Sequence, residues 1–229
     1  MASLQLVSRP FGPFEENTLL ILGPVDASGK RRAVVVDPGM STSAECAEFD
    51  AWCASLGATV ADVLLTHAHL DHVAGAGHVF RTTGLRPRLH PDDRTTYDRA
   101  PVAAALYGVS FDTLPEPIED LADGQVLDLF GCDVHVAHCP GHAPGHVVFY
   151  SERDGWLVGG DVLFRGSVGR TDLPGGDGPA LAAALHRVVY TLPDATEVWP
   201  GHGPTTTVGE ERRTNPFVNG AHTGMLDRT

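Results

Sequence analysis

The sequence is poor in cysteine, in aromatic residues and in basic residues, and it contains no long hydrophobic run. Four of its 229 residues are cysteine, 7% are aromatic, and 16 lysines and arginines stand against 29 acidic residues. No segment approaches the roughly 20 apolar residues of a membrane helix. The N-terminal segment MASLQLVSRPFGPFEEN has no basic region followed by an apolar stretch. These absences argue against a membrane protein and an exported one, and we expect a cytoplasmic protein.

The scarcity of basic residues and of cysteines also limits the partners and the redox chemistry. The formal net charge of −13 disfavours attraction to a phosphate backbone, so we expect no nucleic-acid partner. Cys46 and Cys53 have six residues between them, as do Cys132 and Cys139, which matches neither a zinc knuckle nor a C-x-x-C redox motif. We therefore expect reduced, mostly buried thiols.

A chain of 229 residues can bury a large core as one domain, and we predict a single domain over 1–229. Segment 41–57 predicts a helix, with Ser41 or Thr42 as N-cap, Glu45 completing a capping box and Gly57 as a stop signal. A second helix is predicted at about 179–192. Short apolar runs bounded by turn formers predict strands at 17–22, 33–37, 61–66, 125–130, 132–138, 146–151, 156–161 and 196–199.

Two segments repeat the same order of elements. Each has a strand ending in an acid, then a helix, then a strand followed by a histidine; the pairs are Asp37 with His67 and Asp161 with His202. This order predicts two similar β/α halves that face each other, although such units also recur by chance. The segment 83–120 separates the two halves of the histidine pattern and is a candidate lid over a site.

The stretch THAHLDH follows a strand-like run and concentrates metal-binding side chains. His67 and His69 are two positions apart, and side chains at i and i+2 of an extended segment point to the same side. Both can therefore reach one metal ion. Asp71 and His72 follow where the chain turns toward a helix that we predict to begin near Val73, and the positive end of the helix dipole favours an ionised Asp71.

Three later turns supply further donors: His142 in CPGHAPGH, Asp161 in VGGDVLF and His202 in WPGHGP. With the first motif they make seven donors, more than the four that a tetrahedral zinc ion takes. Two ions sharing one water fit better. If Asp161 bridges, one ion obtains His67, His69, His142 and Asp161, and the other obtains Asp71, His72, His202 and Asp161.

The remaining histidines lack the spacing of metal ligands. His146 is either a group that supports His142 or a strand residue. For the others we expect surface or capping roles: His78, His90, His135, His138, His186 and His222.

The order H-x-H-x-D-H, PGH, GD and PGHGP resembles the metallo-β-lactamase superfamily, in register from about Asp37 to Pro216. The resemblance implies an α/β fold, the four-layer αββα sandwich, in which two β-sheets are flanked by helices. The segments GDVLFRGSVGRTDLPGGD and ERRTNPFV further resemble the glyoxalase II branch, the hydroxyacylglutathione hydrolases, and most closely its short bacterial members. A β-lactamase proper is expected to carry cysteine in place of Asp161, and usually an export signal.

The resemblance implies a hydrolase that cleaves thioesters of the S-lactoylglutathione type. Two cations sharing a water lower its pKa, so that hydroxide forms at neutral pH, while one of them polarises the carbonyl. Asp71 is the expected catalytic residue that orients the hydroxide, and Asp37 is expected to support a ligand or the local structure. Arg170 matches a basic position of the family, which implies an acidic thiol conjugate as the small-molecule substrate; alternatively, Arg170 pairs with Asp172 or Asp177.

The chain also departs from full-length glyoxalase II. It closes with NPFVNGAHTGMLDRT, so we expect no C-terminal helical domain of the kind that helps to hold glutathione. Gly203 and Pro204 follow His202, where the family tends to place an aromatic residue. Imidazole and carboxylate donors suit zinc, iron and manganese alike, and we expect two divalent ions, with zinc first.

Several alternatives would use the same donors. A persulfide dioxygenase, a relative of glyoxalase II, would use a single iron, and GRTD is compatible with it. A lactonase would use the same two-metal chemistry. A phosphodiesterase or nuclease fits the acidic charge less well, and a non-catalytic metal-binding module would be expected to have lost one or more ligands. The sequence leaves the oligomeric state open.

Overall fold

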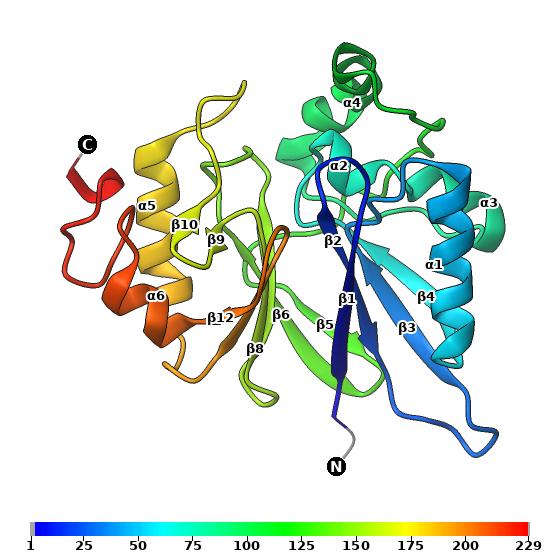
Figure 1. The fold of residues 1–229 in the computed structure, drawn as a ribbon. Helices are drawn as coiled ribbons and strands as arrows, with labels where there is room; N and C mark the ends of the chain where they lie inside the picture. The colour runs from blue at the N-terminus through cyan, green and yellow to red at the C-terminus, as the bar shows by residue number, and fades with distance from the viewer. Residues whose placement is uncertain (1–2, 229) are drawn as a thin grey trace.

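The computed structural model describes residues 3–228. Two β-sheets lie face to face in the middle of the molecule and helices cover both outer faces (Figure 1), which confirms the predicted αββα sandwich. The first sheet has the order β1-β2-β3-β4, with bounds Gln5–Phe11, Glu16–Leu22, Arg31–Val36 and Ala58–Leu64. The second has the order β12-β11-β8-β7-β6-β5, with bounds, from β12 to β5, Thr206–Thr207, Glu197–Pro200, Trp156–Gly160, Val147–Ser151, Cys132–His138 and Val126–Leu129. A small ribbon pairs β9 and β10, with bounds Leu163–Phe164 and Ser167–Val168.

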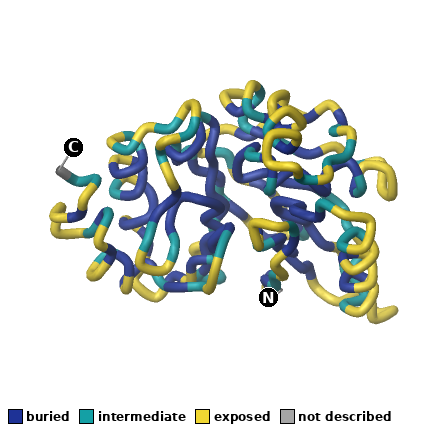
Figure 2. The backbone as a smooth tube through the Cα atoms, turned by 45° about the horizontal axis from the view of Figure 1, so that its top comes forward, coloured by how far each residue is buried: buried dark blue, intermediate teal, exposed yellow. Residues whose placement is uncertain are grey.

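Side chains of the central strands alternate between two buried faces. In β2, Leu19 and Ile21 belong to the core between the sheets, whereas Leu20 and Leu22 pack with Trp52 of the covering helix α1 (Ser43–Ser55). A strand that is covered on both faces needs no polar alternation, which explains the continuous apolar run NTLLIL. Figure 2 shows the consequence: the strands are buried inside, and exposed residues gather on helices and turns.

The first helix begins where the sequence predicts. Thr42 is its N-cap; Glu45 N donates to Thr42 Oγ1 at 3.2 Å and Thr42 N donates to Glu45 Oε2 at 3.0 Å, which completes the capping box. The helix predicted at 179–192 is divided into α5 (Gly178–Arg187) and the 3₁₀-helix η2 (Val189–Thr191). The remaining helices are α2 (Leu70–Val73), α3 (Ala76–Thr83), η1 (Pro91–Asp93), α4 (Arg94–Tyr107), α6 (Val208–Thr214) and η3 (Leu226–Arg228). Within residues 3–228, no helix is long and apolar enough to cross a membrane.

The repeated order of elements appears in the sheets as two parallel strand pairs. β3 and β4 are parallel and connected through α1, and β8 and β11 are parallel and connected through α5. Parallel strands end at the same edge of a sheet, where loops build sites. Asp37 and His67 therefore follow the strand ends of one sheet, while Asp161 and His202 follow those of the other.

The prediction of a helix near Val73 is wrong by three residues, because α2 begins at Leu70. Leu70 and Val73 are one helical turn apart and both pack in a cluster with Tyr97 and Ala100 of α4. This tertiary contact favours an earlier helix start than the local sequence suggests. Segment 83–120, the candidate lid, contains α4, and Tyr97 and Ala100 of that helix are part of the packed core.

Candidate metal centre

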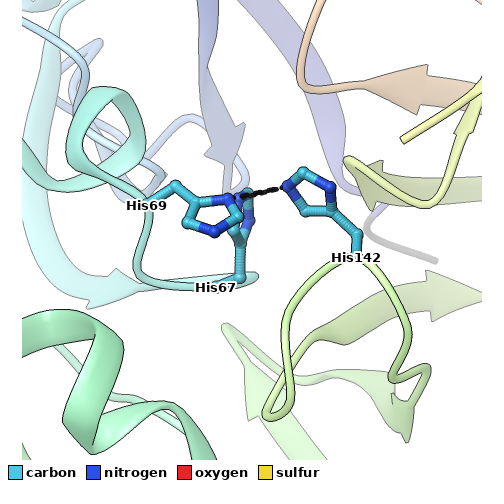
Figure 3. Close-up of side chains that lie close together, drawn as sticks. All are labelled: His67, His69 and His142. Carbon is cyan, nitrogen blue, oxygen red and sulfur yellow. Dashed lines mark hydrogen bonds between the residues drawn. The ribbon is translucent and has the colours of Figure 1, made fainter. Parts of the chain in front are cut away.

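His67, His69 and His142 form the first group of donors. His67 and His69 lie on the turn between β4 and α2, and His142 lies on the facing loop between β6 and β7 (Figure 3). Nε2 of His142 is 2.8 Å from Nδ1 of His69 and 3.2 Å from Nε2 of His67. The three rings are inclined to one another by 80° to 89°, so their nitrogen atoms approach one point from different directions.

Asp71, His72 and His202 form the second group. Asp71 and His72 lie in α2, and His202 follows β11 of the other sheet. Oδ2 of Asp71 is 3.2 Å from Nε2 of His202 and 3.8 Å from Nε2 of His72. Each half of the sandwich thus contributes donors to both groups.

Asp161 lies between the two groups. Its Oδ2 is 3.4 Å from Nε2 of His142 and 3.6 Å from Nε2 of His202, and its Oδ1 is 3.4 Å from Nε2 of His72. One carboxylate is therefore near a histidine of each group, where the sequence predicts a bridging ligand. All seven predicted donors meet at one edge of the sandwich.

Two buried atoms in this cluster make no hydrogen bond of good geometry to any described residue, although they lie 3.4 Å from each other: Nε2 of His72 and Oδ1 of Asp161. Buried polar groups are normally paired, since leaving one unpaired costs about 1–3 kcal/mol. A divalent cation accepts both an imidazole nitrogen and a carboxylate oxygen. The donor set therefore fits metal ions.

The electrostatics differ between the two groups. Burial lowers the pKa of His67 well below its ordinary value and lowers the pKa of His69 to about 3, with smaller contributions from neighbouring imidazoles. Both are therefore neutral near pH 7, as metal ligands must be. Burial alone would also lower the pKa of His72, but Asp161 and Asp71 raise it well above its ordinary value. The carboxylates thus create a field that attracts a positive charge.

Backbone carbonyls fix the orientation of two ligand rings. Nδ1 of His142 donates to the carbonyl of Arg170 at 2.7 Å, and Nδ1 of His202 donates to the carbonyl of Phe14 at 3.0 Å. A carbonyl can only accept, so Nδ1 of each ring carries a proton. The nitrogen left to bind a metal is then Nε2, which faces the cluster.

Asp37 supports His72 from behind. Its Oδ2 is 3.0 Å from Nδ1 of His72, while its Oδ1 accepts a hydrogen bond from Thr66 N at 2.7 Å. A carboxylate on the outer nitrogen of a ligand histidine orients the ring and raises its basicity. Asp37 is therefore placed where it can support His72, and that role stays a prediction.

Three further buried side chains lie near the ligands. The sequence did not predict Glu16 and Asp93 as parts of the site, and it left the role of His146 open. Glu16 is 0% exposed, its Oε2 accepts from Thr18 Oγ1 at 2.8 Å, and its Oε1 is 3.9 Å from Nδ1 of His72. Nε2 of His146 accepts from the backbone N–H of Asp161 at 3.0 Å, so it holds the chain beside that ligand. Asp93, also 0% exposed, bonds two ligand loops. The only local signal for Glu16 is a charge at the start of an apolar strand, and Asp93 gives none.

Arg170 contributes its backbone to the site and directs its side chain outward. Its guanidinium forms a two-point pair with Asp172, with Nε–Oδ1 2.7 Å and Nη2–Oδ2 2.8 Å. This is one of the two roles that the sequence left open. Contact of the Arg170 side chain with a substrate stays a prediction.

Comparison with known sequences identifies related proteins, two of which are named as hydrolases. An uncharacterized protein of Mycobacterium tuberculosis is 39% identical, covering 82% of this chain and 88% of the relative. The hydroxyacylglutathione hydrolase GloC of Haemophilus influenzae is 32% identical and the probable metallo-hydrolase YqgX of Bacillus subtilis is 31% identical; each covers 92% of this chain and 96% of the relative.

Solved structures agree with the fold. TTHA1623 in a di-iron-bound form has a TM-score of 0.80 at 42% identity, covering 93% of this chain and 100% of the other. The B3 metallo-beta-lactamase BLEG-1 has a TM-score of 0.81 at 34% identity, covering 93% and 99%. The model of the metallo-beta-lactamase superfamily matches residues 12–202, which include all seven donors. The chain therefore belongs to the metallo-beta-lactamase superfamily.

Proposed function

We propose that this metallo-hydrolase is a two-metal enzyme that cleaves thioesters of the hydroxyacylglutathione type. The observation that carries the proposal is the position of Asp161, within 3.6 Å of histidine nitrogens in both donor groups. The 32% identity to a hydroxyacylglutathione hydrolase supports the substrate class. The di-iron neighbour supports two ions and supports iron among the three candidate metals, zinc, iron and manganese.

The three-histidine group with Asp161 would hold one ion, and Asp71, His72 and His202 with Asp161 the other. Two cations held by these residues would lower the pKa of a shared water and polarise the substrate carbonyl. The side chain of Asp71 is 17% exposed, against 10% for Asp161 and 0% for His72. Asp71 is therefore the more solvent-accessible of the two carboxylates. It would orient the attacking water by accepting a hydrogen bond from it.

A thioester suits this site because its leaving group needs little help. A thiol has a pKa near 8.5, so it departs as thiolate near neutral pH without a strong general acid. An alkoxide or amine leaving group would require a proton donor at the leaving atom. The acidic side chains near the donors are instead ligands or supports of ligands.

The rim of the centre supports an acidic thiol conjugate. Phe14 and Tyr107 pack edge to face with ring centroids 5.7 Å apart, and Phe164 lies 6.1 Å from the ring of His202. Arg170 is held by an exposed carboxylate, a weak pair that a substrate carboxylate can replace. The rings would contact the apolar part of the substrate and Arg170 its charged end.

The test is a substrate panel on the purified protein after elemental analysis. The expected result is two metal ions per chain and the highest kcat/KM with S-lactoylglutathione among a thioester, a lactone, a β-lactam and a phosphodiester. The β-lactam is included because BLEG-1 is 34% identical. Binding of metal without cleavage of any thioester would refute the substrate class. One iron per chain, with oxygen uptake on glutathione persulfide, would favour the dioxygenase instead.

Asp71→Ala separates an enzyme from a non-catalytic module. A hydrolase loses most of its kcat, even when measured on protein that elemental analysis shows to be loaded with metal, because the group that orients water is removed; a module that only binds metal has no turnover in the wild type. Asp172→Ala is the matched control, because Asp172 is exposed on the rim and contacts Arg170. An Asp71→Ala variant with unchanged turnover would contradict the mechanism.

A further inference from the structure

Asp93 joins two loops that carry metal ligands. It ends η1 and precedes α4, and its side chain is fully buried. Its Oδ2 accepts from the backbone N–H of Ala68 at 2.7 Å, and its Oδ1 accepts from the backbone N–H of Gly145 at 2.9 Å. One carboxylate therefore holds residues 68 and 145, which are far apart in the sequence.

These two residues are placed to control the three-histidine group. Ala68 stands between His67 and His69, and Gly145 is in the loop that carries His142. The first loop follows the first sheet and the second loop belongs to the second sheet. The bonds from Asp93 thus cross between the halves of the sandwich at the level of the ligands.

The carboxylate of Asp93 accepts hydrogen bonds from these two loops and does not cap its own helix. Asp93 occupies the N-cap position of α4, where an aspartate usually accepts from the backbone of the first turn, yet it makes no such capping bond. Thr96 Oγ1 donates weakly to it at 3.5 Å. A buried carboxylate is unfavourable unless it is hydrogen-bonded, and the N–H groups of Ala68 and Gly145 provide those bonds.

The packing at Gly145 is a second, independent observation that the loop carrying His142 is held at a fixed distance from Asp93. A Cβ atom added to Gly145 would lie 2.4 Å from the backbone nitrogen of Asp93 and 2.8 Å from its Cβ. The loop that carries His142 therefore rests directly on the backbone of Asp93. A larger residue at 145 would push the two apart.

We propose that Asp93 is a positioning residue that fixes the distance between the His67–His69 pair and His142, and so determines the metal affinity of the three-histidine group. The inference rests on the proposed metal centre. Asp93 is not one of the seven donors, and its hydrogen bonds to the site are made to the backbone of the two loops.

The test is a Co²⁺ titration of the full-length protein after its metal has been removed with a chelator. Asn in place of Asp93 keeps the shape but has one accepting oxygen and an amide that cannot accept an N–H, so one loop loses its bond. The expected result for Asp93→Asn is about a 10- to 100-fold weaker affinity for one of the two ions. The visible spectrum of that Co²⁺ should also change, while the other ion is unaffected.

Three further variants make the result specific. Asp92→Asn removes the same charge one residue away on an exposed side chain, and its titration should match that of the wild type. Gly145→Ala should weaken the same ion as Asp93→Asn while leaving the carboxylate in place. Asp93→Asn is also made in a His202→Ala background, in which only the three-histidine group keeps all its donors. A weaker Co²⁺ affinity in that background assigns the effect to the three-histidine group.

The outcomes distinguish this inference from the proposed function. Wild-type protein that binds no Co²⁺ contradicts the metal centre itself. Wild-type protein that binds two ions, with Asp93→Asn giving the same affinities and spectrum, overturns the role of Asp93 alone. Equal weakening of both ions, or a lower melting temperature of the metal-free protein with unchanged binding, also overturns it, because either indicates general structural support. If Asp93→Asn does not fold, Gly145→Ala decides by the same criteria.

Discussion

The three histidines of the metal centre and the pair His90–His138 contain the same kind of donors in opposite arrangements. Within the described chain, each set forms a group whose ligand atoms lie within 4.8 Å of one another; in the pair, Asp92 is the third member. The ring planes of His67, His69 and His142 are inclined to one another by 80° to 89°. The rings of His90 and His138 are stacked, with centroids 4.3 Å apart and an angle of 5° between their planes. Lone pairs lie in the ring planes, so crossed rings can converge on one ion, whereas rings stacked face to face direct their lone pairs along separate, parallel planes.

The hydrogen bonds of the stacked pair differ from those of the centre as well. Nε2 of His138 donates to the carbonyl of Pro144 at 2.8 Å, and Nδ1 of His90 accepts from Asp92 N at 3.3 Å. In the centre, Nε2 of His72 is buried and has no hydrogen-bond partner among residues 3–228. Proximity of donors alone therefore does not identify a metal site; in the centre, crossed rings and buried atoms without hydrogen bonds accompany that proximity.

The largest effect is expected from Asp161→Asn, which breaks the centre where its two groups meet. Loss of the shared charge should weaken both ions by more than roughly 100-fold, beyond the effect of a supporting residue, and abolish thioesterase activity. Metal content by elemental analysis measures the effect. Asp227→Asn is the control, since Asp227 bonds His186 at 2.7 Å in a stacked cluster. Retention of two tightly bound ions by Asp161→Asn would contradict the bridging role.

Asp37→Asn tests the support behind a ligand. Asn keeps the shape but weakens the contact with Nδ1 of His72, so metal affinity and activity should fall by about 10- to 100-fold. A chelator competition assay measures the affinity. Asp92→Asn, which alters the carboxylate beside stacked His90, should leave the affinity unchanged. If Asp37→Asn and Asp92→Asn lowered the metal affinity equally, the metal centre and the stacked pair could no longer be distinguished by their effect on metal binding.

The sequence predicts those parts of the fold and site that depend on local patterns. Apolar runs, the capping box at Thr42 and the donors at strand ends all have short-range signatures. Asp93 and Glu16 have none, because their roles depend on contacts with residues distant in the chain, such as Gly145 and His72. The start of α2 at Leu70 was missed for the same reason, since packing against α4 decides it.

A smaller effect is expected outside the metal centre, at the rim. Arg170→Gln should raise KM for a carboxylate-bearing thioester about two- to fivefold, the value of an exposed ion pair. The kcat and the metal content should stay constant. A thioester of a neutral thiol is the matched control and should show no change in KM. A lower kcat on both substrates would instead assign Arg170 to the support of His142, whose ring bonds the Arg170 carbonyl.

The smallest effect is expected from the double change His90→Gln with His138→Gln. Loss of the stacked pair should lower stability by no more than about 0.5–1.5 kcal/mol, the value of an aromatic pair, because no ion depends on parallel rings. Elemental analysis should give two ions per chain before and after the change, with kcat preserved. Wild-type protein that binds three ions, and a double variant that binds two, would show that the stacked rings rotate to take a metal. Ring orientation would then no longer separate the two clusters, and the contrast between them would rest only on the unpaired atoms at His72 and Asp161.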